Sequence, residues 1–253
     1  MAERDTLKSS QSPSPGTARE IAKRNTWDAL NADIVTCARC PRLVAWREEV
    51  ARTKRRAYRD WSYWGKPVPG FGDPAARLLI IGLAPGAHGS NRTGRMFTGD
   101  SSGETLYGAL YRVGFANQPT ATSREDGLRL DDAFITAIGR CAPPKNRPTS
   151  EELANCRPFL AREIALLSGV RVVLALGKMA FDGYLRLLRE QGADLPRLAF
   201  AHGARYALAS PLPTLMASYH PSRQNTQTGR LTLAMFDAVF EAARGELGII
   251  GSK

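Results

Sequence analysis

The sequence has no long apolar run and contains very little cysteine or histidine. None of its hydrophobic stretches reaches the roughly 18 residues of a membrane-spanning helix, and the polar start MAERDTLKSSQSPSPGTARE lacks the apolar core of a signal peptide. The sequence therefore predicts a cytoplasmic protein that neither enters a membrane nor is exported. In a reducing cytoplasm its four cysteines are not expected to form disulfides, so they need another explanation.

Acidic residues are also in short supply. The chain has 35 Lys and Arg against 24 Asp and Glu, which gives a net charge of +11. Such an excess on a chain of 253 residues favours a polyanionic partner, with nucleic acid ahead of an acidic membrane. The alternative is that the charge serves only solubility, because basic proteins without a polyanionic partner also exist.

The chain divides into a short tail and one larger part. Residues 1–18 are rich in Ser, Pro and charged side chains, which predicts a disordered tail. Residues 19–253 contain enough apolar residues for one substantial core, so we expect a single domain there. Helical spacing is expected from Ala18 to about Val35, and the basic stretch Arg42–Arg59 is expected to start as a helix.

Further along, short apolar runs bounded by Gly or Pro alternate with segments of helical periodicity. This alternation predicts a three-layer α/β/α protein with a central four-stranded, mainly parallel sheet. Because parallel strands end at the same edge of a sheet, the four loops that follow them are expected to converge on one crevice. The predicted strands are Leu78–Leu83, Phe134–Ile138, Val170–Leu176 and Leu215–Tyr219, and the predicted helices that follow them are Thr105–Val113, Glu151–Leu167, Lys178–Arg189 and Leu231–Arg244.

The loop after the first predicted strand, GLAPGAHGSNRTGRMFTGD (82–100), is rich in glycine. Glycine lets a backbone approach a ligand closely, and Arg92 and Arg95 offer forked donors for phosphate. The loop is not a Walker loop, because no Gly-Lys-Ser/Thr closes it. It is not a dinucleotide fingerprint either, because no GxGxxG turn opens into a helix.

Two other strand ends carry polar residues. The loop HPSRQNTQTG (220–229) begins with His220 at a strand end, where it could face a leaving group, although a lone histidine can equally be structural. The loop RCAPPKNRPT (140–149) contains Asn146, whose amide could read a base edge or merely bond to its own turn. It ends in Thr149, a predicted N-cap.

The cysteines form one close pair and one distant pair. Cys37 and Cys40 have the Cys-x-x-Cys spacing of metal ligands, whereas Cys141 and Cys156 stand far from them and from each other. Four thiolates can bind zinc or an iron–sulfur cluster, and ligand chemistry alone does not separate the two. The second pair is unlike a zinc ribbon, and free buried cysteines are the remaining alternative.

Together these segments resemble the family 5 uracil-DNA glycosylases, the double-strand-active, iron–sulfur branch of the uracil-DNA glycosylase superfamily. GLAPGAHGSNRTGRMFTGD resembles the first motif of that family and HPSRQNTQTG resembles its second. CARC, with Cys141 and Cys156, resembles its cluster ligands in order and spacing. The resemblance runs from about Asp33 to about Ala243 and implies a uracil-DNA glycosylase-like fold.

The resemblance implies how a base would be held. Phe97 would stack on a base extruded from the duplex, and Gly82 and Ala84 would form part of the base pocket. Asn146 would hydrogen-bond the polar edge of the base. Flipping a nucleotide costs a few kcal/mol, and a stacking ring can return about 1–3 kcal/mol.

The resemblance also implies the chemistry. His220 would donate to the departing base as negative charge develops, and Asp100 would orient or activate the attacking water. Chemical reasoning more than the family suggests Arg92, Ser222 and Asn225 for phosphate contacts. The family's substrate class is uracil, hypoxanthine, ethenocytosine and hydroxymethyluracil, and its reaction belongs to base excision repair.

For the cysteines, the resemblance implies a [4Fe–4S] cluster without a redox part in the reaction. Its ligands would be Cys37, Cys40, Cys141 and Cys156. The partner would be double-stranded DNA containing uracil or a damaged base, which implies a cytoplasmic, nucleoid-associated protein. Nothing in the sequence indicates an oligomer, so we expect a monomer.

One position departs from related families. They place Glu, Asp or Asn in the first motif, as in GEAPG or GQDPY, whereas Leu83-Ala84-Pro85 offers no polar side chain, which is itself the family 5 pattern. Assignment of water activation to Asp100 is therefore a hypothesis. The loss of a base leaves an oxocarbenium-like sugar, so stabilising the leaving anion can suffice without a strong base.

Two alternatives remain at the level of sequence. A non-catalytic iron–sulfur module that grips DNA lesions would keep the cysteines and the charge, but it would not need Phe97, Asp100, Asn146 and His220 together. A family 4 type uracil-DNA glycosylase, which prefers single strands, would carry a polar first motif, and Leu83-Ala84-Pro85 argues against it.

Overall fold

The computed structural model describes residues 26–249. The predicted tail (1–18), residues 19–25 of the predicted domain and residues 250–253 lie outside this range, as does the start of the helix expected from Ala18. The described part of that helix begins at Trp27, where the side chain of Thr26 caps it by accepting the backbone N–H of Ala29.

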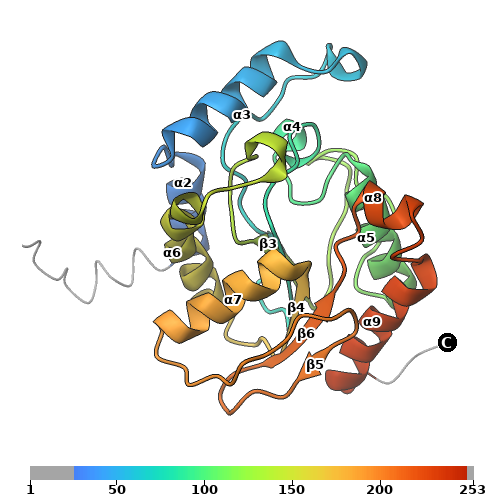
Figure 1. Ribbon diagram of the computed structural model, residues 1–253. Coiled ribbons are helices and arrows are strands. Elements are labelled where there is room, and N and C mark those ends of the chain that lie inside the picture. The colour runs from blue at the N-terminus through green and yellow to red at the C-terminus, as the bar shows by residue number, and fades with distance from the viewer. Residues whose placement is uncertain (1–25, 250–253) are drawn as a thin grey trace, which may run out of the picture.

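A mixed six-stranded sheet lies at the centre of the fold, in the order β1-β3-β2-β4-β6-β5 (Figure 1). Its four central strands are parallel, and Ile80 of β2 lies opposite both Ile135 of β3 and Leu174 of β4. The strands are β1 (Phe71–Gly72), β2 (Leu78–Gly82), β3 (Ala133–Ala137), β4 (Val172–Leu176), β5 (Arg205–Tyr206) and β6 (Thr214–Ser218).

The predicted four-stranded sheet is the parallel centre of this larger sheet. The two additional strands, β1 and β5, are antiparallel and lie at its opposite edges. Each has only two residues, and neither is fully buried, so neither produces an apolar run that marks a strand in the sequence. The expectation of four strands was therefore too low, whereas the α/β class is confirmed.

Helices cover both faces of the sheet, as Figure 1 shows. Alternate strand residues, among them Ile80 and Leu174, pack with α5 and α9 in one core. The residues between them, among them Leu79 and Val173, pack with α6 and α7 in the other. The helices are α2 (Trp27–Val35), α3 (Pro41–Thr53), α4 (Ser90–Thr93), α5 (Ser101–Val113), α6 (Ser150–Leu166), α7 (Lys178–Glu190), α8 (Arg223–Gln227) and α9 (Leu233–Glu246), with 3-10 turns η1 (Arg56–Tyr58) and η2 (Pro144–Asn146).

The helix that follows β3 starts where the sequence predicts. Thr149 caps α6 by accepting the Glu152 N–H at 3.2 Å, and the Glu152 carboxylate accepts the Thr149 N–H at 2.7 Å. This reciprocal pair is a capping box.

Among residues 26–249, no helix combines the length and the apolar character that crossing a membrane requires.

Candidate active site

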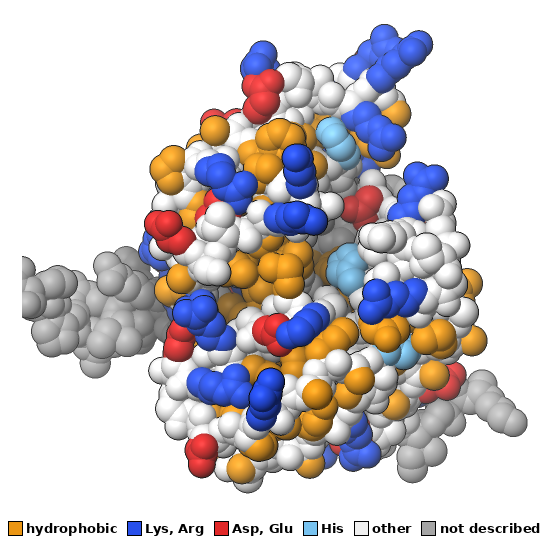
Figure 2. Space-filling view, viewed as in Figure 1, with side chains coloured by type: hydrophobic (Ala, Val, Ile, Leu, Met, Phe, Trp, Pro, Cys, Tyr) orange, Lys and Arg blue, Asp and Glu red, His pale blue; other side chains and the backbone are white. Residues whose placement is uncertain are grey.

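A pocket of about 850 Å³, including its open mouth, lies at the carboxyl edge of the parallel strands. Its walls come from the loops after β2, β3 and β6, and Figure 2 shows the molecular surface hollowed in the middle of the viewed face. The sequence-predicted residues in its lining are Ala84, Phe97, Asp100, Asn146, His220 and Ser222.

The fourth loop does not reach the pocket, contrary to expectation. After β4 the chain turns at Gly177, which has a φ of +95° and caps α7 directly. No residue of this short connection is in the pocket lining, although Gly177 lies near the Cβ of His220. The crevice is therefore built by three strand ends instead of four.

Asp100 reaches the pocket from the first position before α5. Its Oδ1 accepts the Gly103 N–H at 3.0 Å and so caps the helix. A Cβ at Gly89 would lie 2.0 Å from Oδ2, so the glycine allows the carboxylate to sit against the loop backbone. Burial raises the pKa of Asp100, while hydrogen bonds from backbone N–H groups and the charge of Arg92 act in the opposite direction.

Phe97 lies over the end of β2. A Cβ at Gly82 would come within 2.8 Å of the Phe97 ring, so glycine at that position makes room for the ring. Gly82 itself is not in the pocket lining and supports the ring from below. Phe97 has a φ of +51°, which is strained for a residue with a side chain and must be held by its surroundings.

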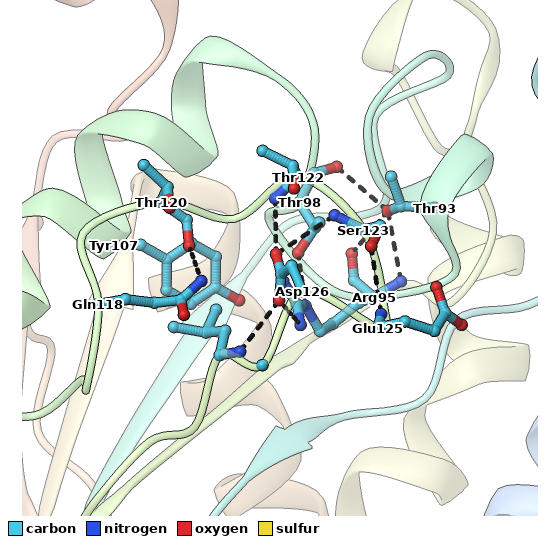
Figure 3. A network of polar contacts seen from close by, with 12 residues as sticks. Thr93, Arg95, Thr98, Tyr107, Gln118, Thr120, Thr122, Ser123, Glu125 and Asp126 are labelled. Carbon is cyan, nitrogen blue, oxygen red and sulfur yellow. Dashed lines mark hydrogen bonds and ion pairs between the residues drawn. The ribbon is translucent and has the colours of Figure 1, made fainter.

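The polar network in Figure 3 holds the segment around Phe97. Arg95 pairs with Asp126 through two hydrogen bonds of 2.8 and 2.6 Å, and its Nε donates to Thr98 Oγ1 at 2.9 Å. The Tyr107 hydroxyl donates to the Met96 carbonyl at 2.7 Å. Burial would raise the pKa of Asp126, but hydrogen bonds from Arg95 and nearby backbone N–H groups lower it to about 2. Arg95 thus stabilises the loop and is not available for phosphate.

His220 stands at the end of β6 and faces Phe97. The two rings are stacked, with centroids 5.7 Å apart and an interplanar angle of 30°. Burial lowers the pKa of His220 to about 4, so its imidazole is neutral at physiological pH and carries a single N–H donor. No hydrogen bond links that ring to another described residue, which leaves its nitrogens free for a ligand.

Ser222 and Asn225 support the His220 loop. The Asn225 Nδ2 donates to the His220 carbonyl at 2.8 Å, and Ser222 Oγ accepts the Asn225 N–H at 3.3 Å as the cap of α8. Ser222 lines the pocket, whereas Asn225 does not. Asn225 therefore supports the backbone of His220, and its suggested phosphate contact stays a prediction.

Asn146 lines the same pocket as His220. It is exposed and ends the η2 turn, and both it and the preceding Lys145 have positive φ angles, of +55° and +54°. Two consecutive side-chain-bearing residues in this region are strained, which is a frequent property of ligand-binding positions. The backbone N–H of Asn146 donates to the Pro143 carbonyl at 3.2 Å, whereas its side-chain amide has no hydrogen-bond partner among the described residues.

Arg92 lies away from the pocket surface. Its side chain is 4% exposed, its Nε donates to the His88 carbonyl at 2.8 Å, and its Nη2 donates to the Gly99 carbonyl at 2.7 Å. The predicted phosphate contact is therefore not favoured by this geometry. Sequence reasoning also missed Ser90 and Ser102, two serines of the glycine-rich segment that line the pocket.

The cysteines meet at a second cavity, lined by all four of them. They come from the α2–α3 connection, the beginning of the loop after β3 and the middle of α6. Arg47 Nη1 donates to the Cys141 Sγ at 2.9 Å, and Asn155 Nδ2 donates to the Cys40 Sγ at 3.6 Å. Within residues 26–249, no three or more His, Cys, Asp or Glu side chains are grouped so that they could hold a metal ion. All four cysteines are free of disulfides.

Comparison with known proteins gives a consistent assignment. The family described as "Uracil DNA glycosylase superfamily" matches residues 69–244. A type-5 uracil-DNA glycosylase of Mycobacterium tuberculosis is 52% identical over 221 residues, covering 87% of this chain and 81% of the relative. A type-5 uracil-DNA glycosylase of Pyrobaculum aerophilum is 44% identical, covering 92% of this chain and 99% of the relative.

A type-4 uracil-DNA glycosylase of the same Pyrobaculum aerophilum matches less well. It is 32% identical over 163 residues, covering 63% of this chain and 74% of the relative. The type-5 relative from that organism is both more similar and more completely covered, so the family 4 alternative is not favoured. The family predicted from the two motifs and the cysteine spacing is thereby confirmed, and the chain belongs to the uracil-DNA glycosylase superfamily as a relative of its type-5 members.

Proposed function

We propose that the protein hydrolyses the N-glycosidic bond between uracil and deoxyribose in DNA, as a monofunctional glycosylase of base excision repair. The observation that carries the proposal is the convergence of Phe97, Asp100, Asn146 and His220 on one pocket. These residues come from three separate loops, in a chain that belongs to the uracil-DNA glycosylase superfamily. A module that only grips lesions has no need for this combination of groups.

The geometry supports a division of roles in base recognition. The apolar ring of Phe97 offers a stacking surface for a base that has left the duplex. The amide of Asn146, which has one donor end and one acceptor end, can pair with the polar edge of that base. Because Asn146 makes no other side-chain hydrogen bond within residues 26–249, recognition does not require it to break one.

The chemistry depends on charges that develop when the base leaves. His220 is neutral because burial lowers its pKa to about 4, and its N–H can stabilise the anionic base without first losing a proton to it. The carboxylate of Asp100 can stabilise the cationic sugar and orient water towards it. His220 would therefore act on the base and Asp100 on the sugar, which are the two sides of the bond that breaks in glycoside cleavage.

The proposed range of bases follows from the first motif. The first motif supplies no carboxylate at Leu83-Ala84-Pro85, so catalysis relies on stabilising a leaving group, and bases that leave readily are favoured. We therefore include hypoxanthine, ethenocytosine and hydroxymethyluracil with uracil. The net charge of +11 supports binding to DNA. The proposal includes a duplex substrate bound by a monomer, in the cytoplasm and associated with the nucleoid.

The four cysteines are proposed to hold a [4Fe–4S] cluster. Four thiolates around one cavity are the donor set that such a cluster takes, and because each thiolate binds a different iron atom, the four sulfurs need not converge on a single metal ion. Two buried guanidinium groups also line the cavity, and Arg47 Nε and both Arg140 Nε and Nη1 have no hydrogen-bond partner among the described residues. A cluster with four thiolates carries negative charge and sulfur acceptors, and it would satisfy these N–H groups.

When bound, the cluster would cross-link the α2–α3 connection to the β3 loop and to α6 as a structural group. The residues of this chain do the remaining work, since Arg47 and Asn155 already direct donors at the cysteine sulfurs. Purified protein should be brown and contain four iron atoms per chain, in keeping with the cluster's composition. A colourless protein that contains zinc would contradict the cluster.

The function is tested by single-turnover cleavage of a labelled duplex with one uracil, followed by alkali to break abasic sites. The wild type should release uracil, and His220→Ala should slow this step by about 10²-fold or more, the size of one catalytic donor. Gln224→Ala is the control, because Gln224 is an exposed residue outside the pocket lining. If the wild type binds the duplex but forms no abasic site, the lesion-binding module is the better description.

The same assay tests the finer predictions. Duplexes with hypoxanthine, ethenocytosine or hydroxymethyluracil replace uracil to define the range of bases. The uracil strand without its complement tests strand preference, and a faster reaction on the single strand would contradict the proposed duplex substrate. Sedimentation of the purified protein tests the monomer.

A further inference from the structure

A basic segment, Lys54–Trp61, precedes the part of the chain that the superfamily match covers, residues 69–244. It carries four cationic side chains against one acidic residue, Asp60, and Arg55, Arg56 and Arg59 are exposed. Figure 2 shows Lys and Arg side chains gathered at the end of the molecule where, in Figure 1, α3 leads into this segment. Such a cluster is an electrostatic footprint for a polyanion.

Two aromatic rings of the basic segment enclose a buried arginine of the glycine-rich loop. The guanidinium of Arg92 lies 3.9 Å from the ring centroid of Tyr58 and 4.1 Å from that of Trp61. The two rings are 6.4 Å apart, and Arg92 is 4% exposed. Contacts this short between a guanidinium and aromatic faces are favourable, more so away from water.

The enclosed arginine reaches the pocket through the backbone. Its Nη2 donates to the Gly99 carbonyl at 2.7 Å, and Gly99 directly precedes Asp100. A Cβ at Gly99 would lie 2.4 Å from that nitrogen, so glycine permits this approach. The Nε donates to the His88 carbonyl at 2.8 Å, so one side chain ties together two distant points of the loop that carries Asp100.

We propose that the basic segment is an auxiliary DNA-binding element that also positions the catalytic loop. Its exposed arginines contact phosphates beside the extruded nucleotide, and Tyr58 and Trp61 hold Arg92 as a positioning residue for the Gly99–Asp100 peptide. The inference rests on the proposed glycosylase function. DNA is the polyanion in question because the contacts through Arg92 and Gly99 run from the segment to the substrate pocket.

The DNA contact is tested with Arg56→Gln/Arg59→Gln. Its matched control is the double variant Arg129→Gln/Arg171→Gln, which removes the same charge. Both control residues are exposed and lie before β3 and β4, at the amino ends of the parallel strands, whereas the pocket lies at their carboxyl ends. The first pair should weaken binding of a uracil duplex about tenfold at low salt. The slope of log affinity against log salt should become shallower by roughly 0.9 for each phosphate that the variant no longer binds. Equal affinities of the two double variants would overturn the DNA contact.

The positioning role is tested with Tyr58→Leu/Trp61→Leu, compared with Tyr58→Phe/Trp61→Phe, which keeps both rings. At saturating DNA, the leucine pair should cut the single-turnover rate about tenfold, a larger factor than its change in affinity, and the phenylalanine pair should restore the rate. Tyr111→Leu, an exposed aromatic on α5, is the control and should react like the wild type. A leucine pair with the wild-type rate, or a phenylalanine pair as slow as the leucine pair, would overturn the positioning role.

A pH profile separates positioning from general loss of stability. The charged neighbours of Asp100 are Arg92 of α4 and Glu104 of its own helix, and His220 lines the same pocket. Burial raises the pKa of Asp100, the charge of Glu104 adds to this, and the charge of Arg92 acts in the opposite direction. Arg92→Gln should therefore move the acidic limb of the rate profile to higher pH, and Arg92→Lys should move it less. An unchanged acidic limb in Arg92→Gln would contradict the positioning role. The wild-type protein is included in every assay. An inactive wild type would contradict the proposed function itself, whereas an active wild type with unchanged variants would contradict only the positioning role.

Discussion

The substrate pocket and the cysteine cavity are both polar sites beside the same sheet, but they use their side chains differently. In the pocket, the side-chain amide of Asn146 and the ring of His220 have no hydrogen-bond partner among the described residues. In the cysteine cavity, Arg47 and Asn155 already donate to sulfur atoms. The pocket therefore leaves these two polar side chains without protein partners. The cavity already directs two donors at its cysteines and leaves only Arg47 Nε, Arg140 Nε and Arg140 Nη1 without a partner among the described residues.

The backbone shows the same difference. Positive φ angles occur in the pocket loops at Phe97, Lys145 and Asn146, where strain costs on the order of 1–3 kcal/mol per residue. None of the four cysteines has a positive φ angle. Substitutions in the pocket should therefore change the chemistry more than the stability, and substitutions in the cysteine cavity should do the reverse.

The largest effect on stability is expected for Cys141→Ser. If the proposed cluster is bound, this change removes one of its ligands. Loss of a metal group is among the few changes that cost about 4 kcal/mol or more, so the variant should contain less iron than the wild type and unfold at much lower temperature. Iron content and thermal unfolding measure this. Ser222→Ala, on the pocket side, is the control and should keep its iron. If Cys141→Ser kept both its iron and its stability, the two sites would not differ as described.

The next largest effect is expected for Asp100→Asn. Asn is as good an N-cap as Asp, so the bond to the Gly103 N–H can persist while the charge is removed. The single-turnover rate should fall by about 10- to 100-fold, with thermal stability close to that of the wild type. If the rate fell only as far as a loss of folded protein explains, Asp100 would act only as a helix cap.

A smaller effect is expected for Asn225→Ala. It removes the 2.8 Å hydrogen bond to the His220 carbonyl, worth about 1 kcal/mol, so the rate should fall about fivefold through misplacement of the ring. Gln224→Ala, a neighbouring exposed residue, is the control. A loss of affinity at unchanged rate would instead favour the phosphate contact predicted from the sequence.

The smallest effect is expected in the neutral part of the pH profile. Burial lowers the pKa of His220 to about 4 from its ordinary 6.5, so the ring stays neutral from pH 8 down to pH 6. An ordinary histidine would lose about three quarters of its neutral form over that range. The single-turnover rate should therefore show no step near pH 6.5 and should decline only at lower pH. A step near pH 6.5 would show that His220 is solvated and ordinary.

Much of the architecture was accessible from the sequence because it depends on local patterns. The apolar runs predicted the four central strands to within two residues at each end, and Thr149 was predicted as the cap of α6. The edge strands β1 and β5 were missed because two residues cannot display a period. The loop after β4 was expected in the crevice because topology alone does not reveal how tightly Gly177 turns.

In the candidate site, too, some residues could be predicted from the sequence and others could be placed only by the fold. The family resemblance pointed to Phe97, Asp100, Asn146 and His220, and the structure brings them together in one pocket. The position of Arg92 was different from expectation, because Tyr58 and Trp61, far upstream in the chain, remove it from solvent. An arginine in a glycine-rich loop looks like a phosphate ligand whenever its distant neighbours are unknown.

Short segments of the chain encode the alternation of strands and helices, the family and the identity of the candidate reacting groups, so all three could be read from the sequence. The folded chain was needed to show which of these groups face the pocket, which are buried behind it, and which protonation state His220 adopts. The physical reason is that burial and charge neighbours are set by residues distant in sequence, and both act through space over a few ångströms.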